Sequence, residues 1–144
     1  VMFYGCTKFI GNGLENWNVA NVTNMGNLFS LCKAFNRPLN WNVANVLSMA
    51  FMFENTAAFV QDVSSFNFNK NVILQQFFLN KTASYPSAFY DALLKKCAES
   101  FIGTGRTQTN KALNCGAVKY TIVGKPYRDA LISNGWTITD GGLI

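Results

Sequence analysis

The residues that could perform acid–base or nucleophilic chemistry are few in this chain. Histidine is absent, which removes the commonest general base and the usual partner of a nucleophilic serine or cysteine. The carboxylates show no paired spacing, even for Asp129 and Asp140, whereas glycoside hydrolysis needs two facing carboxylates. Gly103 and Gly105 do not continue into a phosphate-binding loop. We therefore expect no enzymatic activity, no catalytic residue and no cofactor.

Four cysteines are candidates for metal binding or disulfide chemistry. No C-x-x-C pair exists, so we expect no metal site. Cys6 and Cys32 fall at equivalent places of a sequence repeat, which fits a disulfide but fits a pair of core thiols better. Cys97 and Cys115 flank a polar loop expected at 103–110. For this pair, a disulfide bridge and two free thiols remain equal alternatives.

A repeat of 24 to 26 residues organises the first half of the chain. Two close copies are spaced by 24 residues, in the pairs Trp17 and Trp41, Val22 and Val46, Met25 and Met49, Phe29 and Phe53, and Phe35 and Phe59. A looser third copy has Phe66 in place of the tryptophan, and a partial copy precedes the first. Self-similarity of this length lies in the leucine-rich-repeat range and is typical of a solenoid.

The apolar spacing within a repeat predicts a strand followed by a short helix. Leu39, Trp41 and Val43 alternate with polar residues, which is the period of a strand with one buried face. The stretch from Val22 to Phe29 carries an apolar stripe of helical spacing. We expect parallel strands near residues 14–19, 39–43 and 63–68. The predicted fold class is α/β, a leucine-rich-repeat-like solenoid of about three coils with short parallel strands and short helices.

The sequence changes character after about residue 83, and residues 84–144 are predicted to cap the repeat region 1–83 as part of one continuous domain. An open solenoid end exposes an apolar stripe and a strand edge that must be covered. The predicted cap has two helices and a final strand. We expect its apolar residues to pack over the end of the third coil near residues 77–79: Phe89, Leu93, Leu94, Leu131, Ile132, Trp136 and Ile138.

The composition limits the partners of the chain. Charged residues make up only 13%, and the net charge of +5 is spread along the sequence, whereas nucleic-acid binding favours basic residues on one face. No run approaches the length of a membrane span. The chain opens in mid-repeat at Val1, which we interpret as a fragment of a longer protein. We expect a monomer that binds no nucleic acid and has no membrane span.

The polar residues that alternate with the apolar strand positions predict a candidate ligand-binding face. Solenoids often use such faces for recognition, but a solvated face that only satisfies turns is an equal alternative. Trp17 and Trp41 are expected in the core rather than as sugar-stacking platforms. The candidate face comprises Asn16, Asn18, Asn40, Asn42, Ser65, Asn67 and Asn69.

The repeats 17–39 (WNVANVTNMGNLFSLCKAFNRPL) and 41–63 (WNVANVLSMAFMFENTAAFVQDV) resemble those of the BspA-like leucine-rich-repeat surface proteins of bacteria. The resemblance is to the branch with repeats of about 25 residues, which is also seen in mycoplasma lipoproteins. The cap is similar to the closing segment of such arrays, in Tyr90 to Leu94 and in Trp136 to Gly142. The resemblance implies a secreted or cell-surface adhesion or recognition module that binds a protein or a glycan, or a structural spacer within a longer surface protein.

One departure from that family changes the chemistry of the face. The family usually places Asp after the repeat tryptophan, whereas this chain has Asn18, Asn42 and Asn67 at that position. Neighbouring parallel strands lie about 4.8 Å apart, so stacked carboxylates would repel one another. Stacked asparagines are instead expected to hydrogen-bond along the column.

Overall fold

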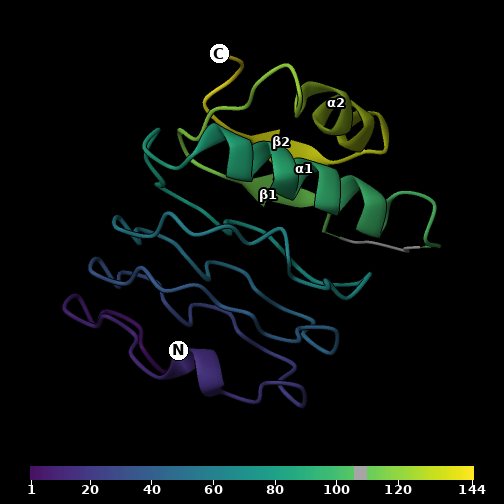
Figure 1. Cartoon of the computed structure of the whole chain (residues 1–144). Coiled ribbons are helices and arrows are strands. Elements are labelled where there is room, and N and C mark those ends of the chain that lie inside the picture. Colours follow the sequence, from purple (N-terminus) through teal and green to yellow (C-terminus); the bar gives the residue numbers. More distant parts are fainter. Residues whose placement is uncertain (106–109) are drawn as a thin grey trace.

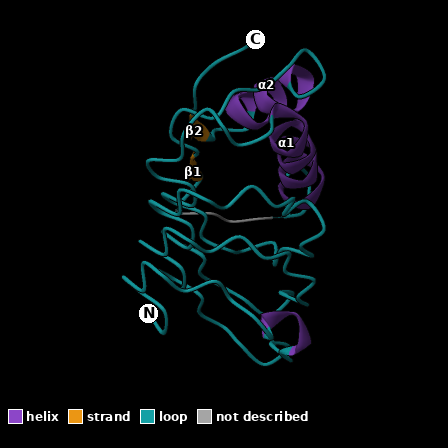
Figure 2. Cartoon of the chain, turned by 60° about the vertical axis from the view of Figure 1, so that its left-hand side comes forward, coloured by secondary structure: helices purple, strands orange, loops and turns teal. Residues whose placement is uncertain are grey.

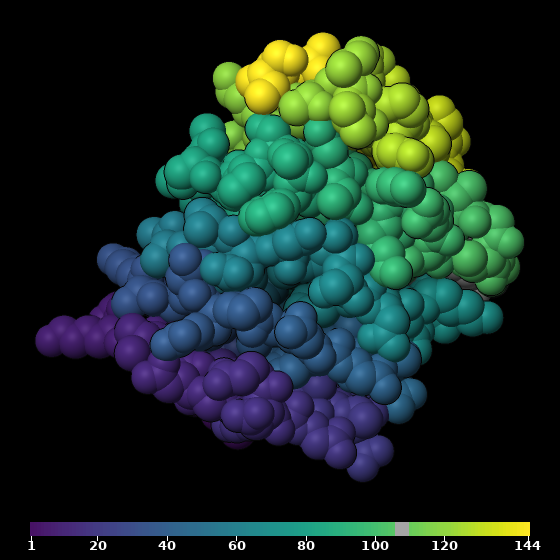
Figure 3. Space-filling model, in the orientation of Figure 1, coloured from purple at the N-terminus to yellow at the C-terminus, as the bar shows by residue number. Residues whose placement is uncertain are grey.

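The computed structural model describes residues 1–105 and 110–144 as a stack of chain layers under a helical cap. Residues 106–109, in the loop predicted at 103–110, lie outside the described residues. Figure 1 shows the N-terminus at one end of the stack and the C-terminus at the other. In the space-filling view the colours follow one another along the molecule (Figure 3), so each layer lies mainly against its neighbours in sequence.

Regular secondary structure among the described residues is concentrated in the cap. Helices α1 (Ser87–Phe101) and α2 (Lys125–Ser133) lie beside two short parallel strands, β1 (Ala112–Asn114) and β2 (Thr137–Thr139). The layers below contain a single 3-10 turn, η1 (Leu14–Asn16), and otherwise appear as loops and turns in Figure 2. The regularity of the layers therefore lies in their turns and in the bonds between them.

Four segments, residues 1–7, 24–34, 48–58 and 73–81, run side by side and are called ribbons 1 to 4. Every second N–H of a ribbon donates to a carbonyl of the next one: Met25 to Ser48, Asn27 to Ala50, Phe29 to Met52 and Leu31 to Glu54, at 2.8–3.0 Å. Ribbon 3 donates to ribbon 4 in the same way, from Met49 to Ile73 and at each second residue up to Asn55. The ribbons are therefore joined by a parallel backbone ladder.

The N–H groups between these ladder donors close turns inside each ribbon. In ribbon 2, Leu28 donates to Met25 at 3.2 Å and Cys32 to Phe29 at 3.0 Å. In these two turns, and in the equivalent turns of ribbons 3 and 4, the third residue has positive φ, as a type II turn requires. These residues are Asn27, Leu31, Phe51, Asn55, Gln76 and Asn80, with φ between 51° and 64°.

The short helices predicted within the repeats are therefore wrong. A helix would send the N–H groups of residues 22–29 back to carbonyls of the same segment, and the neighbouring ribbons would lose the ladder. A succession of turns keeps Met25 and Phe29 buried while leaving alternate N–H groups for the next ribbon. The spacing of buried residues alone does not distinguish these two arrangements.

The predicted strand positions are also wrong, although their alternation of buried and exposed residues is present. Leu39, Trp41 and Val43 are buried, and Asn40 and Asn42 are exposed. The parallel bridges instead run through residues 24, 48 and 73. Near 39–43 the layers are joined by side chains, for example by the Trp41 indole, which donates to the Leu14 carbonyl at 2.9 Å.

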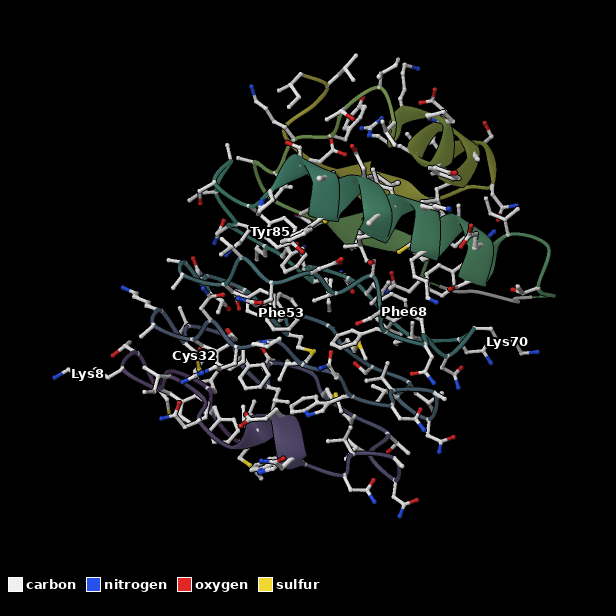
Figure 4. All side chains as sticks on the ribbon, viewed as in Figure 1. Lys8, Cys32, Phe53, Phe68, Lys70 and Tyr85 are labelled. Atoms are coloured by element: carbon white, nitrogen blue, oxygen red, sulfur yellow. The ribbon has the colours of Figure 1, made fainter. Side chains whose placement is uncertain are left out.

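Two columns of phenylalanine rings run through the core of the stack. Phe29 stacks on Phe53 at 5.8 Å, and Phe35 stacks on Phe59 at 5.6 Å. The columns also contact each other, with 4.1 Å between the centroids of Phe29 and Phe35. Figure 4 shows Phe53 and Phe68 inside the stack, whereas Lys8 and Lys70 point away from it at opposite edges.

The prediction that both repeat tryptophans are buried is only half right. Trp41 is 4% exposed, but Trp17 is 43% exposed. Trp17 belongs to the outermost layer of the described stack. Its ring contacts that of Phe3, with 5.9 Å between the two ring centroids. Trp41 lies one layer further in and contacts Phe29 at 6.0 Å.

The cap continues the stack through both backbone and aromatic contacts. Phe78 of ribbon 4 donates to the Asn114 carbonyl of β1 at 2.9 Å, and Ala117 donates back to Lys81 at 2.8 Å. The chains approach so closely here that a Cβ at Gly116 would lie 2.5 Å from the Lys81 carbonyl oxygen. The backbone of the cap therefore extends the ladder beyond the repeats.

The apolar face of the cap agrees only in part with the prediction. Trp136, Leu93, Leu94 and Leu131 are buried, but Ile132 is 43% exposed. Two rings absent from the prediction make the junction. Phe101 stacks on Trp136 at 5.1 Å and contacts Phe68 at 6.0 Å, and Tyr85 contacts Phe78 at 4.9 Å.

Two buried carboxylates hold the elements of the cap together. Asp140, after β2, accepts from the Tyr90 hydroxyl of α1 and from Arg128 Nε of α2, both at 2.8 Å. The hydrogen bond from Arg128 to Asp140 raises the pKa of the Arg128 guanidinium. Asp91 of α1 accepts from the Thr121 N–H at 2.9 Å, just before α2 begins. Each carboxylate therefore connects one element of the cap to another.

We expect Trp136→Ala to destabilise the protein by about 3–5 kcal/mol, because it removes a buried ring stacked on Phe101. The exposed Ile122, also in the cap, provides the control, and Ile122→Ala should change stability by less than about 0.5 kcal/mol. Urea unfolding monitored by circular dichroism measures both. Equal stability of Trp136→Ala and the unsubstituted protein would show that the ring does not connect the cap to the stack.

Candidate functional site

The seven residues of the candidate face lie at the surface, six of them exposed and Asn69 half-buried. Because successive repeats are stacked, equivalent residues form columns across the layers. Asn18, Asn42 and Asn67 form one column, called the inner column. Asn16, Asn40 and Ser65, each two residues before a member of that column, are called the outer column.

The inner column is fixed by hydrogen bonds. Asn67 Nδ2 donates to Asn42 Oδ1 at 2.8 Å, which confirms the expected bond between stacked asparagines for this pair. Asn67 Oδ1 also accepts from the N–H of the buried Val43 at 2.9 Å. The side-chain oxygen of Asn18 accepts from the Ala20 N–H at 3.1 Å, and that of Asn42 accepts from the Ala44 N–H at 3.2 Å. The amides of this column therefore join layers and close turns.

Aspartates at these three positions would not make the same column. An ionised carboxylate only accepts hydrogen bonds, whereas the amide of Asn67 donates to Asn42 and accepts from Val43 at the same time. Asparagine rather than aspartate at this position therefore gives a bonded column instead of a repulsive one.

The outer column offers hydrogen-bonding groups to solvent. Within the part of the chain that the structure describes, no side-chain hydrogen bond engages Asn16, Asn40 or Ser65. Asn69, at the edge of the face, is occupied, since its Nδ2 donates to the Ala44 carbonyl at 2.8 Å. The face therefore presents a row of amide and hydroxyl groups beside a row that holds the layers in register.

The chemistry available on this face is hydrogen bonding. None of its seven residues is ionisable in the ordinary pH range, so the face has no general acid or base beside the Ser65 hydroxyl. Amides donate and accept together, which suits sugar hydroxyls and the polar groups of a peptide. The described residues contain no group of three or more Cys, Asp or Glu side chains placed to hold a metal ion.

An ionisable residue that the sequence interpretation did not single out lies inside the stack. Lys81 is 2% exposed, and its ammonium donates to the carbonyls of Thr56 at 2.6 Å and Ala57 at 3.2 Å. The ammonium lies 5.9 Å from the ring centroids of Phe59 and Tyr85. Burial lowers the pKa of Lys81 from 10.5 to about 8. Because Lys81 follows Cys6, Cys32 and Thr56 in the same repeat position, extending the repeat alignment would have identified it.

The cap contains an open cavity of about 430 Å³ between α1 and the start of α2. Its lining is mainly apolar, with Ala88, Ala92, Val123 and Tyr127. The one carboxylate there, Asp91, is engaged by Thr121. Lys95 is the other charged residue of the lining.

A family model described as "Mycoplasma protein of unknown function, DUF285" matches residues 1–89. No curated protein and no solved structure matches the chain. None of the helices in the described residues is long and apolar enough to cross a membrane.

We expect Asn67→Ala to cost about 1–3 kcal/mol of stability, because it leaves the buried Val43 N–H without its acceptor. Asn40→Ala, in the outer column, should stay within about 0.5 kcal/mol of the unsubstituted protein. Urea unfolding of the two variants gives the comparison. Coincident unfolding curves for Asn67→Ala and Asn40→Ala would mean that the inner column does not hold the layers.

Lys81 should make stability rise with pH above pH 8. Below that pH the lysine is charged in both states, and the folded protein bears the whole cost of burying the charge. Between pH 8 and 10.5 the unfolded chain retains a proton that the folded chain has lost, so the free energy of unfolding increases. From pH 7 to 10.5 the stability of the unsubstituted protein relative to Lys81→Met should rise by up to about 3 kcal/mol.

Taking the difference from Lys81→Met cancels the contributions of other groups. Burial also raises the pKa of Tyr85, Tyr90 and Cys115, which lowers stability at alkaline pH in both proteins. The exposed Lys70 supplies the control, because Lys70→Met should leave the pH profile unchanged. Parallel profiles for Lys81→Met and the unsubstituted protein would contradict a buried ammonium.

Proposed function

The chain belongs to the DUF285 family, whose function is unknown, and we propose that it is a noncatalytic recognition or adhesion module. Its ligand, a protein or a glycan, binds at the outer column of the candidate face. The observation that carries this proposal is the contrast between the inner and outer columns, which lie next to each other in the sequence. One is held by hydrogen bonds between layers, and the adjacent one has no such bonds within the described chain.

A fixed, uncharged row of polar groups suits recognition for an energetic reason. Binding costs conformational freedom in the side chains that it immobilises, and that cost falls when the surface is already ordered. The inner column fixes the backbone beneath Asn40 and Ser65, so only the outer side chains must be ordered. Hydrogen bonds from several layers then add along the face, as is common in repeat proteins.

The resemblance of the repeats to BspA-like surface proteins supports the same proposal. In this interpretation the stacked ribbons form a leucine-rich-repeat-like solenoid, and the module is secreted or displayed on the cell surface. Residues 84–144 close the solenoid, and the recognition face lies on the repeat region. The chain acts as a monomer.

A structural spacer within a longer surface protein is the second candidate. The observation that favours it is the internal use of several amides of the face, including those of Asn42, Asn67 and Asn69. A spacer needs only layers that stay in register, and the inner column supplies that without any ligand. The outer column distinguishes the two functions, because a spacer has no use for it.

Binding of the full chain to arrays of extracellular matrix proteins and glycans tests the proposal. The test variant combines Asn16→Ala, Asn40→Ala and Ser65→Ala, which leaves the inner column intact. The control combines Ser133→Ala and Thr137→Ala, two exposed hydroxyl residues of the cap. We expect a ligand whose affinity falls at least about tenfold in the test variant, a loss of about 1.4 kcal/mol, and stays unchanged in the control.

Two results would contradict recognition at this face. Absence of binding across both arrays favours the spacer. A ligand that binds the triple variant and the unsubstituted protein equally well places recognition elsewhere on the molecule. Equal unfolding curves for the variants ensure that a lost affinity does not reflect lost structure.

A further inference from the structure

Four residues fall at the same position of successive ribbons: Cys6, Cys32, Thr56 and Lys81. Each follows a residue with positive φ, which fixes its place in the turn. The ladder bonds on either side show that Cys6 and Cys32 lie opposite one another. Gly5 donates to the Ser30 carbonyl at 2.9 Å, and Ala34 donates to the Thr7 carbonyl at 3.1 Å.

The side chains in this column reach back to the preceding ribbon. Thr56 Oγ1 donates to the Phe29 carbonyl at 3.2 Å, and Lys81 Nζ donates to the Thr56 carbonyl. Cys32 Sγ likewise donates to the Phe3 carbonyl at 2.9 Å. The same carbonyl accepts the N–H of Cys6 at 3.0 Å. The Cys32 sulfur therefore lies beside the backbone of Cys6.

We propose that Cys6 and Cys32 form a redox-active pair that a small-molecule disulfide, such as oxidised glutathione, converts into a disulfide between ribbons 1 and 2. Residues opposite one another on neighbouring parallel strands are about 4.8 Å apart. Disulfides join residues whose Cα atoms are about 4.4–6.8 Å apart. Both thiols are free in the structure.

The exposure of the two thiols sets the order of the reaction. Cys6 is exposed and Cys32 is buried, so the reagent reaches Cys6 first. The Cys6 thiolate attacks one sulfur of the glutathione disulfide, and the S–S bond breaks to give a mixed disulfide and one glutathione thiolate. The Cys32 thiolate then attacks the Cys6 sulfur and expels the second glutathione. The protein loses two electrons and two protons, and the glutathione disulfide is reduced to two thiols.

The second step is limited by ionisation of Cys32. Burial raises the pKa of this thiol to about 11, with the Cys6 N–H acting in the opposite direction. Only the thiolate attacks a disulfide. The conversion of the mixed disulfide should therefore accelerate about tenfold per pH unit between pH 7 and 9.

The other two cysteines provide an internal comparison. Cys97 and Cys115 are buried in the cap, and burial raises the pKa of Cys115. A reagent in solution has no exposed thiol to attack at this pair. Oxidation of the folded protein should therefore consume two of the four thiols and spare those of the cap.

The test treats the folded full chain with oxidised glutathione and follows intact mass and disulfide-linked peptides. We expect a loss of two hydrogen masses, a peptide linking Cys6 to Cys32, and free thiols at Cys97 and Cys115. In Cys32→Thr, Cys6 should instead retain one glutathione, because nothing resolves the mixed disulfide. Threonine is the suitable replacement, since Thr56 already fills the same place in ribbon 3. In Cys6→Ser, neither product should form.

Three outcomes would overturn the proposal. These are arrest of the unsubstituted protein at the glutathione adduct of Cys6, a linked peptide that joins Cys97 to Cys115, and four thiols that all remain unoxidised. A resolution rate that does not change between pH 7 and 9 would contradict attack by the buried Cys32. The peptide map of the unsubstituted protein decides the question even where a variant does not fold.

Discussion

The structure depends on the division of backbone N–H groups between two uses. In ribbons 2 and 3 one N–H donates to the next ribbon, and the following one closes a turn within its own ribbon. This alternation satisfies backbone groups that would otherwise be buried unpaired at a cost of about 1–3 kcal/mol each. It also requires left-handed residues every four positions, including Leu31 and Phe51, which lack the tolerance of glycine or asparagine for positive φ. The bonds to both neighbouring ribbons hold these residues in a conformation that a single ribbon would not keep.

The ladder determines where side chains of successive repeats meet. Because equivalent residues lie one above another, each repeat position becomes a column. Phenylalanines fill the columns of the interior, and Asn42 and Asn67 bond within a column at the surface. A third column contains Cys32, Thr56 and Lys81, whose side chains each donate a hydrogen bond to a carbonyl of the preceding ribbon. The proposed recognition face and the proposed redox pair are both consequences of this register.

The sequence predicts the features that depend on the repeat period. It identifies which residues are equivalent, which residues at 39–43 are buried, and that asparagines stack. It does not predict the backbone between them, because a stripe of residues such as Met25 and Phe29 is compatible with a helix or with successive turns. The choice depends on bonds to the neighbouring layers. The exposure of Trp17 depends on its place in the outermost layer, which local spacing does not encode. The burial of Lys81, in contrast, follows from the repeat position that it shares with Cys32 and Thr56.

The same limit applies to the candidate site. The alternation of residues places seven polar side chains on one face, but their spacing is equal in both columns. Only the hydrogen bonds of Asn67 to Asn42 and Val43 separate a column that holds the layers from one that is open to a ligand. A substitution at Asn42 or Asn67 would therefore confuse lost stability with lost binding, whereas Asn40 reports on binding alone.

Scalar couplings across hydrogen bonds, measured by NMR on labelled protein, test the ladder most directly. The structure predicts couplings from the nitrogen of Met25 to the carbonyl carbon of Ser48, and likewise from Asn27 to Ala50 and from Phe29 to Met52. Couplings within residues 22–29 from each N–H to the carbonyl four residues earlier, with none to the next ribbon, would show helices and contradict the ladder.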